Sequence, residues 1–238
     1  REACLKQSEL ATRLDPSDKH LWRNRALLLF QFQDNAWNPS VFFPPHDVGN
    51  WQELYGFIPR TENWQAILDE CAQHDPDNAL YDYLAAIYLS SVSTQKKSLW
   101  QTEILDPPKH KLAQQRLRAG LKKPFLKTGY TGEAATLAFL SHTTFTMNQQ
   151  TQMAESRKNN FREKYILCRL FQILDQEYQS EFLLKQYDAL DVYFRDYLKI
   201  SQQLSNGPAY DNFAKLGQDF YSLEKVKLIT LNQKFPGL

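Results

Sequence analysis

Histidine and acidic side chains are the groups of this sequence that could hold a metal ion or transfer protons. The five histidines never lie within four residues of one another, and the chain contains no His-Glu-x-x-His motif. Glu177 and Glu181 lie one helical turn apart, as carboxylates of di-iron bundles do, but no Glu-x-x-His accompanies them. We therefore predict that both glutamates lie on a surface and that the chain has no metal site.

One histidine, His46, has neighbours that are typical of a site. It follows Pro44 and Pro45 and precedes Asp47 in a segment rich in aromatic residues. A hydrogen bond that anchors the loop is the favoured interpretation of His46, and catalysis is the alternative.

Nucleophilic and nucleotide-binding motifs are absent from the sequence. It has no Gly-x-Ser-x-Gly motif, and the segment from Gly129 to Gly132 is too short for a phosphate loop and lacks the following Lys-Ser/Thr. The three cysteines, Cys4, Cys71 and Cys168, are far apart and give neither a disulfide framework nor a CxxC metal site. We expect them to be small buried hydrophobes, and we predict no catalytic residues and no cofactor.

The amino-acid composition indicates which secondary structure must position any functional site. The 238 residues are 42% hydrophobic and 13% aromatic, which suits a large core and excludes intrinsic disorder. Only 8 glycines and 11 prolines are present, which disfavours an all-β sandwich and favours long helices. The longest purely apolar run, Leu84 to Leu89, is far shorter than the roughly 20 residues that span a bilayer. No membrane span is expected.

Charge is distributed unevenly along the chain. Residues 1–90 carry a net charge of −6, residues 91–130 carry +7, and the remainder is neutral. The basic segment lacks the interleaved aromatic residues of nucleic-acid-binding surfaces, so a nucleic-acid partner is not expected. We interpret the segment as a solvated helix face whose cations complement the helix C-terminus near Lys122-Lys123. Pairing of these cations with the acidic first third is a further option.

Two Asp-Pro pairs mark turns between helices. Asp15-Pro16 and Asp75-Pro76 each end one apolar-periodic segment and begin another, 60 residues apart. Proline cannot extend the preceding helix but suits the first turn of the next one, and nearby Asp or Asn residues cap free amides. The chain opens in apolar register with Leu5, Leu10 and Leu14, so two helical hairpins are predicted. A further helix, started by the Pro107-Pro108 pair, is predicted over Leu112 to Leu121, before Pro124.

The two hairpins resemble the tetratricopeptide repeat. The resemblance covers residues 4–31 and 64–90. It rests on the pattern of the first helix of the repeat, helix A, in which a large residue near the start is followed by small and apolar residues at helical spacing. The matching residues are Trp22, Ala26 and Leu29 after Pro16; Tyr81, Leu84, Ala85 and Tyr88 after Pro76; and Leu68 and Cys71 before it. The resemblance implies helical hairpins that bind proteins or peptides. The spacing of 60 residues departs from the 34 of the family.

The segment from Asn35 to Asn63 interrupts the helical pattern with prolines and aromatic residues. Long structured connections of this kind are often functional, so its aromatic residues are the predicted partner- or ligand-binding residues. The predicted binding residues in the segment are Trp37, Phe42, Phe43, His46, Trp51 and Tyr55, and Trp64 directly after the segment is added to them. They either fill the core between the hairpins or contact a partner, and the sequence leaves both alternatives open.

The C-terminal part has the spacing of packed helices. Seven residues recur at alternating intervals of four and three: Leu183, Tyr187, Leu190, Phe194, Tyr197, Ser201 and Leu204. Asn206-Gly207-Pro208 ends this helix, and Phe213 to Leu223 continue the spacing on a second one. An antiparallel hairpin follows, with the helix around Tyr165 and Cys168 as a third member.

The sequence therefore predicts an all-α fold of tetratricopeptide-like helical hairpins packed with a C-terminal antiparallel helical bundle. Residues 1–130, with the insertion 35–63, form the first region, and residues 131–238 form the second, unless the two make one continuous domain. The favoured function is a non-enzymatic protein-interaction or scaffolding module with a protein or peptide partner. The alternative is an enzyme or ligand-binding protein with a cleft under the 35–63 loop. We expect a soluble chain, and its start at Arg1 without Met is consistent with the extracytoplasmic part of a longer precursor.

Overall fold

A computed structural model of the chain describes three continuous stretches and several short pieces of the C-terminal half. The described residues are 2–31, 58–98, 101–128, 166, 169–170, 173–174, 192, 195–200 and 202–203. Most of them are helical, in agreement with the predicted all-α class. Among these residues, no helix has both the length and the apolar character needed to cross a membrane.

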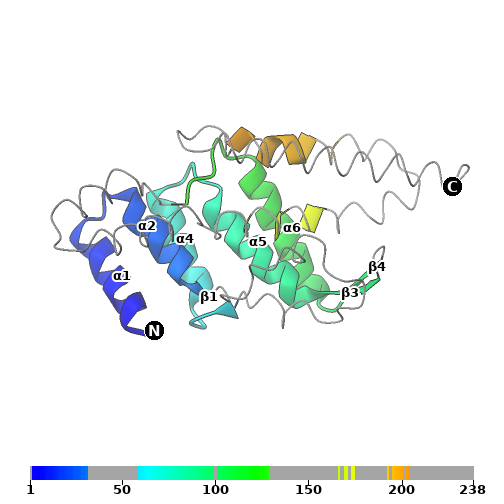
Figure 1. Ribbon diagram of the computed structural model, residues 1–238, viewed down its shortest axis with the longest axis horizontal. Helices are drawn as coiled ribbons and strands as arrows, with labels where there is room; N and C mark the ends of the chain where they lie inside the picture. The colour runs from blue at the N-terminus through cyan, green and yellow to red at the C-terminus, as the bar shows by residue number, and fades with distance from the viewer. Residues whose placement is uncertain are drawn as a thin grey trace, which may run out of the picture.

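Five helices follow one another along the described part of the chain (Figure 1). They are α1 (Glu2–Leu14), α2 (Lys19–Leu28), α4 (Trp64–His74), α5 (Leu80–Ser93) and α6 (Pro107–Leu121). Each packs on its neighbours in this order, so that α1 lies at one end and α6 at the other. The helix predicted over Leu112 to Leu121 is confirmed, and it ends at Leu121 as expected but begins earlier, at Pro107. Asp106 caps it by accepting a hydrogen bond from the Lys109 amide at 3.0 Å.

The two Asp-Pro pairs lie in the turns between α1 and α2 and between α4 and α5. The predicted place of the prolines, in the first turn of the next helix, is wrong, because both helices begin later. In the first turn Asp18 is the cap, and its carboxylate accepts a hydrogen bond from the His20 amide at 2.8 Å. The indole of Trp22 donates to the Pro16 carbonyl at 2.9 Å and fixes the turn against α2.

Two short antiparallel pairs of strands accompany the helices, and the sequence pattern did not predict them. In the first, β1 (Phe30–Gln31) pairs with β2 (Ile58–Pro59) and brings together the two ends of the segment 32–57. In the second, β3 (Thr94–Ser98) pairs with β4 (Gln101–Ile104) directly after α5. The strands of the first pair are only two residues long, and β3 (Thr-Gln-Lys-Lys-Ser) is polar throughout, so neither pair shows an alternating apolar pattern in the sequence.

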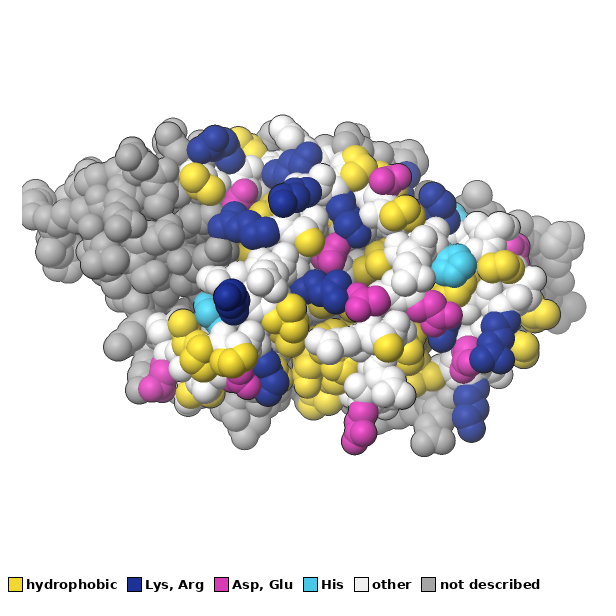
Figure 2. All heavy atoms as spheres, turned by 180° about the vertical axis from the view of Figure 1, so that it is seen from behind, with side chains coloured by type: hydrophobic (Ala, Val, Ile, Leu, Met, Phe, Trp, Pro, Cys, Tyr) yellow, Lys and Arg dark blue, Asp and Glu magenta, His cyan; other side chains and the backbone are white. Residues whose placement is uncertain are grey.

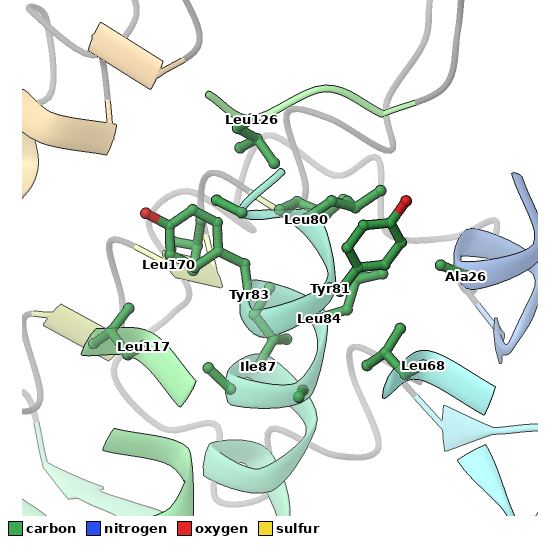
Figure 3. Close-up of a cluster of buried hydrophobic side chains, with 14 of the residues drawn as sticks. Ala26, Leu68, Leu80, Tyr81, Tyr83, Leu84, Ile87, Leu117, Leu126 and Leu170 are labelled. Carbon is green, nitrogen blue, oxygen red and sulfur yellow. The ribbon is translucent and has the colours of Figure 1, made fainter. Parts of the chain in front are cut away.

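The core is built around α5, of whose residues eleven are buried. Figure 3 shows Tyr81 directed toward Ala26 of α2 and Leu68 of α4, whereas Tyr83 points the other way, toward Leu117 and Leu170. A helix that is apolar on all sides must be covered on all sides. Here α2 and α4 cover one side of α5, and α6 with residues of the C-terminal half covers the other.

Residues of the C-terminal half pack beside the end of α6. Tyr197 is buried, as its place in the heptad pattern predicts, and Arg118 forms an ion pair with Asp196. Gln203 is fully buried: its amide donates to the Gly120 carbonyl at 2.9 Å and also to the Lys123 carbonyl, and its oxygen accepts from the Tyr83 hydroxyl at 2.6 Å. The other predicted members of the C-terminal bundle lie outside the described residues.

We predict that Gly120→Ala destabilises the protein. In an exposed helix this change stabilises by about 1 kcal/mol. At Gly120, however, a Cβ atom would lie 2.5 Å from Cε1 of Tyr83, whose ring is fully buried and cannot move aside. We expect a loss of about 1 to 3 kcal/mol in urea unfolding. In a Tyr83→Leu background the same change should cost nothing, and equal losses in both backgrounds would contradict this packing.

Candidate functional site

The predicted site residues fall mostly outside the described part of the chain. Trp37, Phe42, Phe43, His46, Trp51 and Tyr55 all do. Trp64 is described: it begins α4 and is only 7% exposed. Its ring makes edge contacts with Phe30 and Tyr88, with centroid distances of 5.8 and 5.0 Å. Trp64 therefore packs in the core.

The two Asp-Pro turns lie side by side. Trp22 of α2 and His74 at the end of α4 stack with ring centroids 3.8 Å apart and planes 5° from parallel. The guanidinium of Arg25 lies 5.5 Å from the centre of the Trp22 ring, and it pairs with Glu70 of α4 at 3.2 Å. The equivalent turns of two hairpins, 60 residues apart in sequence, are thus neighbours in space.

Asp75 is the polar centre of this contact, which we call the Asp75 junction (Asp75 with Lys19, Arg23, Asn78 and Tyr81). Its carboxylate is fully buried. It accepts hydrogen bonds from Nε of Arg23 at 2.7 Å, from the side-chain Nδ2 of Asn78 at 2.9 Å and from the Tyr81 hydroxyl at 3.3 Å. Nζ of Lys19 lies 3.7 Å from the other oxygen. Burial opposes ionisation, but the hydrogen bonds from Arg23 and Asn78 outweigh it and hold the pKa of Asp75 below its ordinary value.

Asn78 extends the Asp75 junction to the segment after α6. Its amide also donates to the Lys127 carbonyl at 2.8 Å, and its side-chain oxygen accepts from the amides of Lys127 at 3.0 Å and Leu80 at 3.2 Å. The Ala79 amide donates to the Phe125 carbonyl at 2.9 Å. Three separate parts of the chain therefore meet at one turn, and the Asn78 side chain satisfies the Leu80 amide at the start of α5.

The chemistry of the Asp75 junction is structural. The carboxylate is held by a buried cation and two neutral donors, and burial raises the pKa of the nearby Tyr81 hydroxyl far above its ordinary value. Cys71 is fully buried, and this burial raises the pKa of its thiol to about 12, so it is the inert small hydrophobe that the sequence predicts. Within the described ranges, no group of three His, Cys, Asp or Glu side chains could hold a metal ion.

A second set of charges joins α4, α5 and α6. Arg116 pairs with Asp69 at 2.7 Å and with Asp82 at 3.3 Å, and Lys123 pairs with Asp82 at 2.8 Å. These contacts confirm, for two of its cations, the interpretation that the basic segment pairs with the acidic first third. Figure 2 shows acidic side chains among the basic ones across the middle of one face. The cluster is balanced in charge, which does not favour nucleic acid.

Exposed apolar side chains are the remaining unusual feature of the described surface. They are Leu10, Leu14, Ile58, Ile104, Leu105, Val192 and Leu198. Leu10 and Leu14 share one face of α1, are 56% and 77% exposed, and lie one turn apart. Their apolar register suggests a core position, but among the described side chains of α1 it is Leu5 that packs against the core and Thr12 that is buried. Five residues rotate a helix by about 140°, which separates Leu10 from Leu5.

No family model matches this chain, and no curated protein or solved structure is significantly similar to it.

We predict that Asp75→Asn destabilises the protein strongly at neutral pH, because the change leaves the buried Arg23 without its counter-charge. We expect a loss of about 3 to 5 kcal/mol in urea unfolding. The matched control is Asp77→Asn, an exposed aspartate of the same turn, which should change stability by less than about 0.5 kcal/mol.

The pH dependence of this loss gives a second measurement. Because the pKa of Asp75 is lower in the folded state, its stabilisation is complete above the ordinary pKa and is lost as the pH falls through the folded one. The stability difference between the wild type and Asp75→Asn should therefore shrink between about pH 5 and pH 2. If the difference in free energy of unfolding stays constant or grows on acidification, Asp75 is not ionised in the folded protein.

Proposed function

We propose that this chain is a non-enzymatic protein-interaction module built on helical hairpins. The observation that carries the proposal is the exposed leucine pair on α1, the end helix of the described stack. Exposed apolar residues grouped on one helix face are typical of interaction sites, because contact of apolar surface with water is unfavourable and a partner removes it.

The polar groups of the described residues support the same proposal. The most buried of the charged side chains, Asp75, Arg23 and Asp82, are engaged in contacts between helices. A catalytic group, in contrast, must reach a substrate through a pocket with convergent polar atoms. The aromatic insertion 35–63 remains a second proposed contact region on the grounds of its sequence.

A photo-crosslinking residue at position 14 tests the proposal in extracts of the native source. We expect a crosslinked protein adduct from position 14 and none from position 111, an exposed lysine site on α6. Absence of an adduct from position 14 would contradict a partner on α1.

The insertion is tested separately. Gln31 pairs with Ile58, so a two-residue Asn-Gly turn can replace residues 32–57 and keep the β1–β2 register. We expect this variant to fold, and we expect affinity capture with it to lose the partners that a crosslinker at position 51 of the full chain identifies. If the shortened chain still captures every partner, the insertion is not a contact region.

A further inference from the structure

The exposed side of α1 has the spacing of a helix-packing surface. Ala3, Gln7, Leu10 and Leu14, here called the outer stripe, follow one another at intervals of four, three and four residues, and all four are exposed. This interval pattern keeps side chains on one line along a helix and is the seam along which two helices interlock. An extended peptide, whose side chains repeat every second residue, does not match it.

The opposite side of α1 is already occupied. Thr12 is fully buried, its hydroxyl donates to the Ser8 and Glu9 carbonyls, and Arg25 of α2 donates to it at 3.3 Å. Leu5 packs against the core. The helix is therefore fixed by one face on α2, and the outer stripe is presented on a rigid element.

The charges beside the outer stripe indicate the partner. Lys6 and Arg13 are both exposed, and they lie seven residues apart, on the same flank of the stripe. No ion pair joins Lys6 to another described residue, and Arg13 pairs with Glu9 of the same helix in a solvent-exposed contact. Exposed pairs of this kind are weak and rearrange easily.

The same charges argue against a second copy of this chain. In an antiparallel pair of α1 helices, Lys6 of one copy would face Arg13 of the other, and like charges at these positions are unfavourable. In a parallel pair, this flank would face the side that carries Ala11, which offers no counter-charge.

We infer that the outer stripe of α1 docks an amphipathic helix of a partner protein whose apolar seam is flanked by acidic residues. The inference rests on the proposed function and names the chemistry of the partner. Leu10 and Leu14 supply the buried contacts, and Lys6 and Arg13 select the acidic flank and the orientation of the incoming helix.

Two synthetic peptides test this inference with the full chain. Both are 21-residue, lactam-bridged helices with leucines at heptad spacing, one with Glu and one with Lys at the flanking positions. Fluorescence anisotropy should show binding of the Glu peptide only, and its affinity should fall when the salt concentration rises from 0.05 to 0.5 M.

Variants of the chain identify the surface that binds. Leu10→Ser with Leu14→Ser should weaken binding of the Glu peptide at least about tenfold. The matched control is Ile104→Ser with Leu105→Ser, which removes another exposed apolar pair and should leave binding unchanged. Lys6→Glu with Arg13→Glu should transfer the preference to the Lys peptide. Because all of these residues are exposed, the melting temperatures should stay within a few degrees of the wild type.

Three outcomes would overturn the inference. These are equal binding of both peptides, no binding of either, or self-association in analytical ultracentrifugation that Leu14→Ser abolishes. The proposed function is judged separately by the crosslink at position 14. A protein adduct there without binding of the Glu peptide would overturn the inference and leave the proposed function standing.

Discussion

The buried carboxylate of Asp75 needs partners, and the chain supplies them from its own turn and from Arg23, 52 residues away. Arg23 comes from α2, Asn78 from the turn before α5 and Tyr81 from α5 itself, and Asn78 also holds the Lys127 backbone. An ionised group without such partners could not remain buried. The position of each hairpin and of the segment after α6 is therefore specified by one turn.

This requirement follows from the burial of α5. The first residues of α5 are buried, so the protein itself must supply partners for their free amides. Asn78 does so at the start, where its oxygen accepts from Leu80. At the far side of the core, Gln203 performs the same task for α6 by binding the carbonyls of Gly120 and Lys123. Each of these two amide side chains binds a helix end and also a part of the chain that is distant in sequence.

The sequence predicts the local structure well where the signal is local. Asp-Pro pairs identify both turns, and Pro107 identifies the start of α6, because proline restricts the backbone at its own position. The pairing of Asp75 with Arg23 could not be predicted. The two residues are 52 positions apart, and no local sequence pattern around either residue indicates the other as its partner. Gln203 was missed for the same reason.

Candidate site residues are harder to predict, because burial depends on what covers a face. Trp64 belongs to an aromatic-rich region that fits either a binding surface or a core, and its contacts with Phe30 and Tyr88 place it in the core. Leu10 and Leu14 have the periodicity of buried residues, yet they are exposed because the described neighbour of α1 covers only its other side. Periodicity identifies a face but does not tell whether the chain itself covers it.

The central claim is that the Asp75 junction couples the two hairpins, and a double-mutant cycle between Arg23 and Asp75 measures this coupling. The free energies of unfolding of Arg23→Met, Asp75→Asn and the double variant are compared with that of the wild type in urea. We predict an interaction energy of about 2 kcal/mol or more, with the double variant less unstable than the sum of the single changes. Additivity within about 0.5 kcal/mol would show that the two side chains act independently and would contradict the account.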